Sequence, residues 1–325
     1  MTFLSDAAIA RLRGLEDRPD FAATRYDVLE EIGRGGMGIV FRGRDRELAR
    51  DVAIKVTAWS TAGDADRLRR EARTLAALEH PGIVPVHDVG QLPDGRVFTV
   101  MMLVRGERLD ACAARLPLPD RLRLFDRVCD TMSFAHARGV IHRDLKPANI
   151  MIGPFGQVLV LDWGLARPGD RPGARPGSDP SAAQSGSDPG AAQSGSDPDR
   201  AATTVHGGTD GYMAPEQIGG NVDARSDVYA LGAILDGLAG DTGSRVLRPL
   251  KSVIDRARRS DPAARYQTVA ELAADVRRFV DGAAVTAHKE TVLERTRRVA
   301  RTYRTPLALV LAYLVMRGLL LFWRA

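Results

Sequence analysis

Residues 139–153, GVIHRDLKPANIMIG, place a histidine, an arginine, an aspartate, a lysine and an asparagine within eight positions. Apolar residues lie on either side, VI before this group and IMI after it. Polar side chains crowded between apolar runs are costly to bury unless they pair with one another or with a ligand. This stretch is therefore the first candidate for a functional site.

Three residues in and after this stretch could bind a divalent cation. Asp144 and Asn149 are five positions apart, and Asp162 follows thirteen positions after Asn149. Carboxylate and amide oxygens suit Mg²⁺, a hard ion that commonly bridges a protein to the phosphates of its substrate. We expect one of the two carboxylates to stay free of metal and to orient a hydroxyl group.

A glycine cluster, IGRGGMGIV, has G-x-G-x-x-G spacing at Gly33, Gly35 and Gly38. In a dinucleotide-binding fold a helix would follow the third glycine, but here a strand pattern follows. Glycines between two strands allow backbone N–H groups to close over phosphates, although an ordinary hairpin turn is the alternative. Lys55 ends an apolar strand pattern further on, where a lone ammonium favours an anion as its partner, and Glu71 could hold it in place.

The elements that must position these residues follow from periodicity. Alternating apolar and polar residues predict strands over 26–33, 38–45, 51–57, 83–90 and 96–104, with a helix over 66–78. After Gly106 the periodicity is helical, longest over 121–139, with short strands at 150–152 and 158–161. The pattern predicts a small β-rich lobe followed by a mainly α lobe.

The motifs GxGxxGxV, VAIK, HRDLKPAN, a DxG triplet, APE and SDVYALG occur in this order and together resemble the protein kinase family. The resemblance covers about residues 26–281. HRDLKPxN is similar to the serine/threonine branch, as is Thr209, and GRGGMGIVFRGRD with YMAPEQ looks most like the bacterial eukaryotic-like (Hanks-type) serine/threonine protein kinases. The resemblance implies an α+β, bilobal protein-kinase fold, with an N-lobe over 26–104 and a C-lobe over 105–281.

The resemblance also implies the reaction, in which the γ-phosphate of ATP passes to serine or threonine hydroxyls of proteins, with Mg²⁺. Lys55 would hold the α- and β-phosphates and pair with Glu71, Asp144 would accept the hydroxyl proton, and Lys146 would steady the γ-phosphate. The implied metal ligands are Asn149 and Asp162. The implied nucleotide-binding residues are the glycine loop, an apolar wall and the hinge backbone: Ile32, Gly33, Gly35, Gly38, Val40, Ala53, Lys55, Met102, Val104 and Met151.

We expect phosphorylation of the activation segment to control the site through Arg143. A phosphate on that segment could give the Arg143 guanidinium a bidentate, charge-assisted partner. Thr203 and Thr204 are the favoured acceptors, which implies autophosphorylation, and the family leaves room for a homodimer that does this in trans. The alternative is that Arg143 makes only local hydrogen bonds. Two structural roles are also implied, an ion pair between Glu216 and Arg265 and a brace of the catalytic loop by Asp227.

The sequence departs from the family pattern at three places. Trp163 replaces the usual phenylalanine after the metal-binding aspartate. A nine-residue unit rich in Gly, Ser, Asp and Pro runs three times from Gly177, and we expect the insert over about 168–202 to be disordered. The region 236–250 is short for the usual substrate-docking loop and helix, which leaves substrate choice unpredicted and a non-catalytic nucleotide-binding scaffold (pseudokinase) open as the alternative.

The formal net charge is +5, and residues 285–325 alone carry eight Lys/Arg against two Glu, so the basic charge lies in the tail. This distribution favours a membrane surface over nucleic acid as partner. The two cysteines, Cys112 and Cys129, indicate neither a disulfide framework nor a zinc site. The charged N-terminal extension, 1–25, does not resemble a signal peptide, so we expect a cytoplasmic kinase domain.

The segment 306–323, PLALVLAYLVMRGLLLFW, is the longest apolar run. At ~1.5 Å per residue it spans about 27 Å, slightly less than the ~30 Å hydrocarbon core. Arg317 is unfavourable in the membrane, but it lies near the end of the run and can reach the interface. We expect a C-terminal apolar helix that anchors the chain in the inner (cell) membrane after a basic linker, 282–305; the alternative is a helix that packs on a partner or on the kinase domain.

Overall fold

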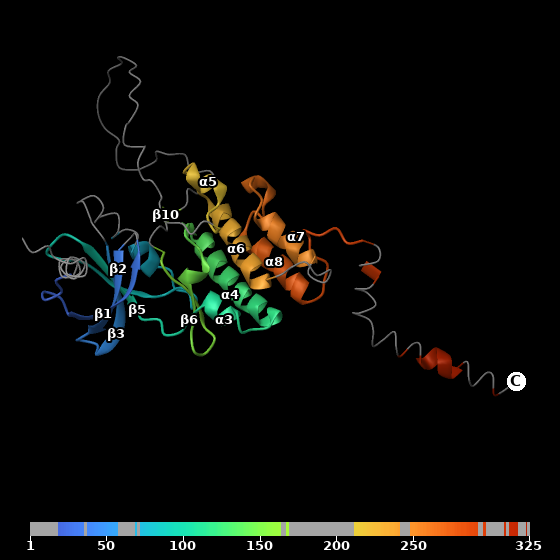
Figure 1. Cartoon of the computed structure of the whole chain (residues 1–325), viewed down its shortest axis with the longest axis horizontal. Helices are drawn as coiled ribbons and strands as arrows, with labels where there is room; N and C mark the ends of the chain where they lie inside the picture. The colour runs from blue at the N-terminus through green and yellow to red at the C-terminus, as the bar shows by residue number, and fades with distance from the viewer. Residues whose placement is uncertain are drawn as a thin grey trace, which may run out of the picture.

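The computed structural model of the protein describes residues 19–35, 38–57, 69, 72–163, 167–168, 211–240, 248–291, 295–296, 309, 312–317 and 323. These residues form a β-sheet lobe, blue to teal in Figure 1, and a helical lobe, green to orange. The predicted α+β architecture with a β-rich N-lobe and a mainly α C-lobe is confirmed for this part of the chain.

The N-lobe contains an antiparallel five-stranded sheet with the spatial order β1-β2-β3-β5-β4. Its strands are β1 (Tyr26–Gly35), β2 (Gly38–Asp45), β3 (Arg50–Thr57), β4 (Val86–Gln91) and β5 (Val97–Met102). β3 is the central strand, and its Val52, Ile54 and Val56 are buried. Valine and isoleucine favour strands because branched side chains pack well on a pleated surface.

β4 begins three residues later than the apolar pattern predicts. Ile83 does not join the sheet but forms an isolated parallel bridge with Val160 of the C-lobe. The predicted helix over 66–78 is described as helical at 69 and over 72–76, and Leu78 after it packs into the C-lobe core. Apolar residues between this helix and β4 therefore connect the two lobes.

Phe21, which precedes the first strand, packs into the N-lobe core. Its side chain is buried, and its ring lies edge-on to that of Phe98 on β5, with 4.9 Å between centroids. Tyr26 contacts Phe98 in the same manner at 6.1 Å. The packed N-lobe thus includes residues before β1.

The C-lobe is mainly helical, with α3 (Leu109–Ala113), α4 (Leu118–Ala137), α5 (Pro215–Ile218), α6 (Ala224–Ala239), α7 (Arg248–Ala257) and α8 (Val269–Val280). Short elements complete it: β6 (Glu107–Arg108), β7 (Val140–Ile141), η1 (Pro147–Asn149), β8 (Ile150–Ile152), β9 (Val158–Val160), β10 (Arg167–Pro168) and η4 (Pro262–Ala264). α4 starts earlier than the predicted 121 because proline is tolerated in the first turn of a helix. It ends before Gly139, whose φ of 74° is unfavourable for other residues.

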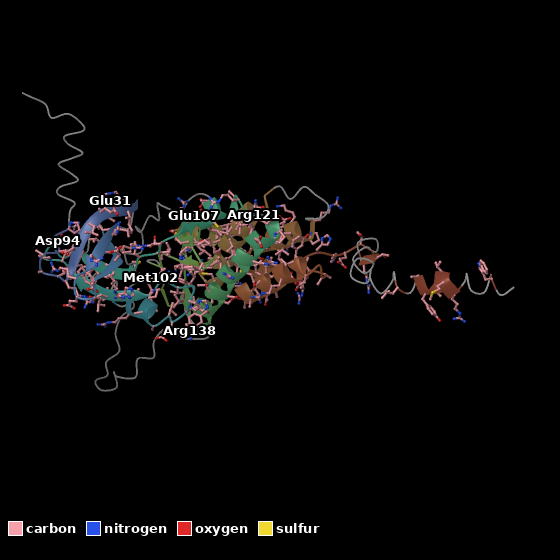
Figure 2. All side chains as sticks on the ribbon, turned by 90° about the horizontal axis from the view of Figure 1, so that it is seen from below. Glu31, Asp94, Met102, Glu107, Arg121 and Arg138 are labelled. Carbon is pink, nitrogen blue, oxygen red and sulfur yellow. The ribbon has the colours of Figure 1, made fainter. Side chains whose placement is uncertain are left out.

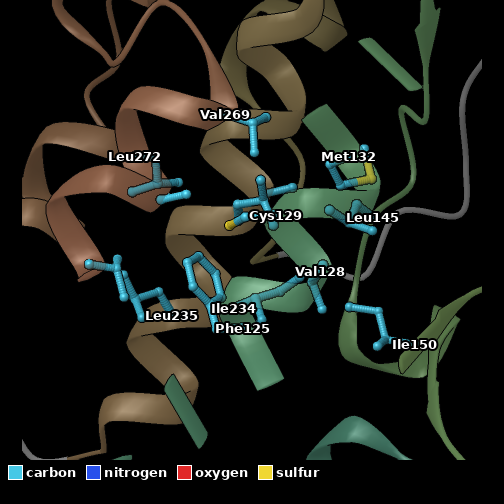
Figure 3. Packing of buried hydrophobic residues seen from close by; sticks show 14 of the residues in the cluster. Phe125, Val128, Cys129, Met132, Leu145, Ile150, Ile234, Leu235, Val269 and Leu272 are labelled. Carbon is cyan, nitrogen blue, oxygen red and sulfur yellow. The ribbon is translucent and has the colours of Figure 1, made fainter. Parts of the chain in front are cut away.

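The core of the C-lobe forms where α4, α6 and α8 meet (Figure 3). Phe125 and Val128 of α4, Ile234 of α6 and Leu272 of α8 are almost fully buried. Leu145, which lies within the polar stretch 142–149, and Ile150, which follows it directly, belong to the same cluster. The core therefore supports the backbone of the candidate site directly.

The packed lobe continues beyond α8. Val285 is buried in the C-lobe core, and the fully buried Asp275 carboxylate accepts the backbone N–H groups of Thr286 at 2.8 Å and Ala287 at 3.1 Å. A buried carboxylate with several donors is a strong local anchor. It fixes the start of the segment that we expected to be a linker.

The predicted C-terminal apolar helix over 306–323 is not confirmed. Of that segment, residues 309, 312–317 and 323 are described; they are helical and exposed, and 312–317 stand apart from both lobes in Figure 1. Within the described part of the chain, no helix has the length and apolar character needed to cross a bilayer.

Candidate active site

Lys55 occupies the middle of the N-lobe sheet. It pairs with Val40 on β2 and with Thr99 on β5, so strands on both sides hold its backbone. Its ammonium contacts the carboxylate of Asp162, and the two side chains are 17% and 36% exposed. Glu71, the expected partner of Lys55, lies outside the described residues.

The catalytic-loop residues form one hydrogen-bonded group. The Lys146 ammonium lies 2.9 Å from Asp144 Oδ2 and 3.2 Å from Oδ1. Asn149 donates through Nδ2 to the backbone oxygen of Asp144 at 2.8 Å and more weakly to its Oδ2 at 3.3 Å. The structure thus brings together the carboxylate, the ammonium and the amide that the sequence predicts to act together.

Asp227 of α6 braces this loop, as predicted. Its buried carboxylate accepts the backbone N–H groups of His142 and Arg143, each at 2.9 Å. His136 of α4 adds a contact of 2.7 Å from its Nε2. Burial alone would raise the pKa of Asp227, but the His136 and His142 contacts outweigh it and the pKa lies below its ordinary value.

Two residues of the site adopt the left-handed backbone conformation, Arg143 with φ of 71° and Asp162 with φ of 56°. This conformation costs a residue with a side chain about 1–2 kcal/mol, so neighbouring contacts must maintain it. His142 links the two, because its Nε2 lies 2.9 Å from the Leu161 oxygen and its Nδ1 accepts the N–H of Asp144 at 3.3 Å. His142 therefore contacts a residue next to each strained position.

Asp162 has a lowered pKa. Burial opposes ionisation of its carboxyl group, but the charge and hydrogen bond of Lys55, with smaller contributions from His142 and Lys146, outweigh burial. Asp162 is accordingly a carboxylate near neutral pH. An ionised carboxylate is the form that can bind a divalent cation.

Trp163 fits into the position next to Asp162. Its side chain is buried at 4% exposure, and its ring lies 4.7 Å from that of His142. Its indole N–H donates to the backbone oxygen of Val160 at 3.0 Å, a bond that phenylalanine could not make. Trp163 also belongs to the hydrophobic core cluster of the C-lobe.

The glycine loop lies at the turn between β1 and β2, where Gly35 pairs with Gly38. Gly38 has φ of 141°, and a Cβ added there would lie 2.0 Å from the Val56 oxygen, so only glycine fits. A Cβ added at Gly35 would meet no atom within 4 Å, and one at Gly33 only Val40, at 3.9 Å. Gly38 is therefore required by the sheet itself, whereas Gly35 is not.

The predicted adenine contacts lie on four strands. Ile32 on β1 is half-exposed, Val40 lies on β2, Ala53 is buried on β3 opposite Met101, and Met151 lies on β8. That these side chains enclose adenine stays a prediction.

Met102, at the end of β5, lies where the sheet lobe joins the helical lobe (Figure 2). Its backbone N–H donates to the Pro85 oxygen at 3.1 Å. That the Met102 carbonyl and the backbone of Val104 contact adenine stays a prediction. The hinge role predicted for these two residues agrees with their place between the lobes.

The residues predicted to bind Mg²⁺ fit that ion in their chemistry. Asn149 uses its amide nitrogen on Asp144, which leaves the amide oxygen as the atom for a metal, and Asp162 is ionised. Among the described residues no group of three or more His, Cys, Asp or Glu side chains is arranged to hold a metal. Two protein oxygens suit Mg²⁺, which usually keeps waters and binds substrate phosphates.

The predicted ion pair between Glu216 and Arg265 is present. Two contacts of 2.7 Å join the carboxylate to the guanidinium, whose side chain is 0% exposed. Ser226 donates to the same carboxylate at 2.8 Å. This bidentate pair fixes α5 to the loop before α8, while Thr203, Thr204 and Thr209 lie outside the described residues.

Two residues of the site were not predicted from the sequence, His136 and Gln217. Gln217 donates to the Arg143 oxygen at 2.8 Å, and His136 reaches Asp227 from α4. Both are separated from their partners by more than seventy positions, so periodicity carries no signal for them. Only their proximity to the HRD and APE motifs could have drawn attention to them.

Comparison with known proteins agrees with this geometry. A family model described as protein kinase domain matches residues 26–242. The serine/threonine-protein kinase PknB of Mycolicibacterium smegmatis is 35% identical over 319 residues, which cover 87% of this chain and 47% of that protein. PknB of Mycobacterium tuberculosis is 36% identical over 315 residues, covering 86% and 46%.

A third relative, the DNA damage-responsive serine/threonine-protein kinase RqkA of Deinococcus radiodurans, is 38% identical over 223 residues, covering 66% of this chain and 29% of that protein. The chain spans about half the length of the PknB relatives that it matches. The matched family, these relatives and the site described above lead to one conclusion: the chain belongs to the protein kinase family, among the bacterial serine/threonine-protein kinases of the eukaryotic-like type.

Proposed function

We propose that the protein transfers the γ-phosphate of ATP to serine and threonine hydroxyls of proteins. The observation that carries this proposal is the Asp144 carboxylate, which Lys146 and Asn149 hold on a loop whose backbone is bonded to Asp227. A carboxylate fixed in this way can orient a hydroxyl and accept its proton. Lys146, whose ammonium lies 2.9 Å from Asp144 Oδ2, would steady the transferred phosphoryl group.

ATP would lie with adenine between the apolar residues of β1, β2, β3 and β8 and its phosphates under the glycine loop. Lys55 would hold the α- and β-phosphates. The Lys55 ammonium contacts the Asp162 carboxylate, so the residue proposed to hold the phosphates lies beside a residue proposed to hold the metal.

Asn149 and Asp162 are the residues that would hold Mg²⁺. A Mg²⁺ ion held there would offset the negative charge of the phosphates. The protein's part is to present an ionised carboxylate and a correctly turned amide, which the low pKa of Asp162 and the bond from Asn149 to Asp144 support.

Regulation of the same site would act through Arg143. We propose that the protein phosphorylates its own activation segment at Thr203 or Thr204, in trans within a homodimer, and that the phosphate pairs with the Arg143 guanidinium. Arg143 directly precedes Asp144 and has a strained backbone, so a contact at its side chain is well placed to influence the catalytic loop.

We further propose that residues 306–323 anchor the cytoplasmic kinase domain in the inner membrane. The apolar run is preceded by six Lys/Arg between Lys289 and Arg304, the charge pattern of a cytoplasmic flank. Asp275 fixes residues 286 and 287 against the C-lobe, so the anchor would connect to a folded base. Membrane fractionation of the full chain and of a chain without residues 306–325 tests this, since anchoring predicts that only the full chain sediments with membranes.

The transfer reaction is tested with radiolabelled ATP and Mg²⁺, comparing the wild type with Asp144→Asn and Lys55→Met. The proposal predicts labelled protein with the wild type and none with either variant, while Asp144→Asn still binds ATP. A non-catalytic scaffold predicts that the wild type and Asp144→Asn bind ATP and that none of the three proteins transfers phosphate. Phosphoamino-acid analysis of the product then distinguishes serine and threonine from tyrosine.

A further inference from the structure

The peptide that joins Arg143 to the proton-accepting Asp144 is held at both of its polar atoms. Its carbonyl oxygen, on Arg143, accepts a hydrogen bond from Gln217 Nε2 at 2.8 Å. Its N–H, on Asp144, donates to His142 Nδ1 at 3.3 Å. Because Arg143 has a φ of 71°, this peptide would turn toward a more favourable conformation if its contacts were lost.

Gln217 lies on α5, at a distance of 74 positions from Arg143. Its other amide atom, Oε1, accepts the backbone N–H of Ala214 at 2.9 Å. One amide thus bridges the start of α5 and the catalytic loop, and only one orientation of its oxygen and nitrogen satisfies both partners. No other side chain of this length supplies a neutral donor and an acceptor together.

The base from which Gln217 reaches the loop is rigid. The preceding residue, Glu216, forms the bidentate pair with the buried Arg265 and accepts a hydrogen bond from Ser226. Side chains position a partner accurately when their own backbone is fixed by other contacts. Gln217 therefore has the support that a positioning residue needs.

We propose that Gln217 is a positioning residue for phosphoryl transfer, which holds the Arg143 carbonyl and so fixes the direction of the Asp144 carboxylate. This inference rests on the proposed kinase function and deepens it. Since α5 follows the segment that contains Thr203 and Thr204, the bond also makes the orientation of Asp144 depend on where the end of that segment is placed. Gln217 need not touch ATP or the acceptor hydroxyl.

The variant Gln217→Glu tests the bond with almost no change of shape. The carboxylate still accepts the Ala214 N–H, but it has no donor for the Arg143 oxygen and repels it. The matched control is Gln267→Glu, because Gln267 also donates from its amide to backbone oxygens, those of Pro262, Ala263 and Arg265 at 3.3, 3.1 and 3.0 Å. These acceptors lie in the loop before α8 and not in the catalytic loop.

For the full-length chain, we measure kcat, the KM for ATP and the melting temperature of the wild type and both variants. Loss of one oriented hydrogen bond predicts that Gln217→Glu lowers kcat about ten-fold. The KM for ATP should stay within about two-fold, since positioning acts on the transition state and not on nucleotide binding. Gln267→Glu should keep the wild-type kcat.

Three results would overturn the inference. The first is a Gln217→Glu variant with wild-type kcat. The second is an equal fall of kcat in Gln217→Glu and Gln267→Glu, or a fall that only follows lost folded protein, which would assign Gln217 a general structural role. A wild type that transfers no phosphate would overturn the proposed function together with this inference, whereas an active wild type with an equally active Gln217→Glu overturns the inference alone.

Discussion

The ammonium of Lys55 contacts the carboxylate of Asp162, although the two residues are 107 positions apart and belong to different lobes. The sheet supplies one partner and the segment after β9 the other. The contact therefore brings together the residue that we propose for the α- and β-phosphates and one of the two residues that we propose for Mg²⁺.

The glycine loop offers a matched pair of substitutions, Gly38→Ala and Gly35→Ala. Alanine at 38 would place its Cβ 2.0 Å from the Val56 oxygen with φ at 141°, so we expect a loss of about 2 kcal/mol or more in the free energy of unfolding. The Cβ of an alanine at position 35 would meet no atom within 4 Å, so the free energy of unfolding should change little. The KM for ATP should rise, because the methyl group would lie where we propose that the phosphates bind. Urea unfolding and ATP kinetics separate the two effects, and equal destabilisation by both would contradict this assignment.

The buried pair between Glu216 and Arg265 predicts a pH dependence of stability. Burial would raise the pKa of Glu216, but the hydrogen bonds of Arg265 and Ser226 outweigh it and hold the pKa below its ordinary value. A carboxyl group whose pKa is lower in the folded state than in the unfolded chain stabilises the fold at pH values above its unfolded-state pKa. This stabilisation is lost as the pH falls through the folded-state pKa. We expect Glu216→Gln to cost about 3 kcal/mol at pH ~7 because Arg265 loses its buried counter-charge.

The measurement is urea unfolding of wild type and Glu216→Gln at neutral pH and at pH below the folded-state pKa, where the difference should shrink. Asp255→Asn serves as control, because Asp255 pairs with Lys251 at the surface with side chains 61% and 44% exposed. Such an exposed pair is worth less than about 1 kcal/mol. A Glu216→Gln difference that stays constant down to acid pH would argue against the charged pair as its cause.

The indole of Trp163 predicts a smaller effect. Trp163→Phe keeps an aromatic ring but removes the donor to the Val160 oxygen, so the variant should lose about 1 kcal/mol of unfolding free energy. Transfer activity should fall as well, because the residue follows Asp162 directly. Trp323→Phe is the control, since Trp323 is 88% exposed and should be neutral. If thermal unfolding cannot distinguish the two variants, the indole bond contributes nothing to the site.

If phosphorylation of the activation segment controls the site, the double variant Thr203→Ala, Thr204→Ala should lower the rate of phosphoryl transfer roughly ten-fold. This is the effect expected from losing one charge-assisted hydrogen bond to Arg143. The triple variant Ser178→Ala, Ser187→Ala and Ser196→Ala changes one serine in each repeat unit and should keep full activity. Initial rates of the purified proteins, after incubation with ATP, provide the comparison. If only the serine variant loses activity, the regulatory phosphorylation site lies in the repeat and not at Thr203 or Thr204.

The sequence predicted the parts of the fold that depend on local pattern. The alternation of apolar and polar residues predicted the strands that hold Lys55 and the glycine loop. The spacing of Asp144, Asn149 and Asp162 predicted the site. Boundaries were less accurate where a tertiary contact decides them. β4 starts late because Ile83 pairs with Val160 across the lobes, which no local pattern indicates.

Contacts between distant residues could not be derived from periodicity. The bond from Gln217 to Arg143 depends on α5 resting on Arg265, and the contact of His136 with Asp227 depends on how α4 packs beside α6. Likewise, Phe21 and Val285 complete the cores of the two lobes from positions that the sequence suggested were extensions. Each of these contacts forms only after the surrounding elements have packed.

The most direct test of the central claim uses the Asp144→Asn chain as a substrate. It is incubated with Mg²⁺ and ATP, either alone or with a small amount of the wild type, and its intact mass is measured. The account predicts that its mass stays unchanged alone and rises by whole phosphoryl groups when the wild type is present. Phosphate gained by Asp144→Asn alone at the wild-type rate would contradict the assignment of Asp144 as the proton acceptor.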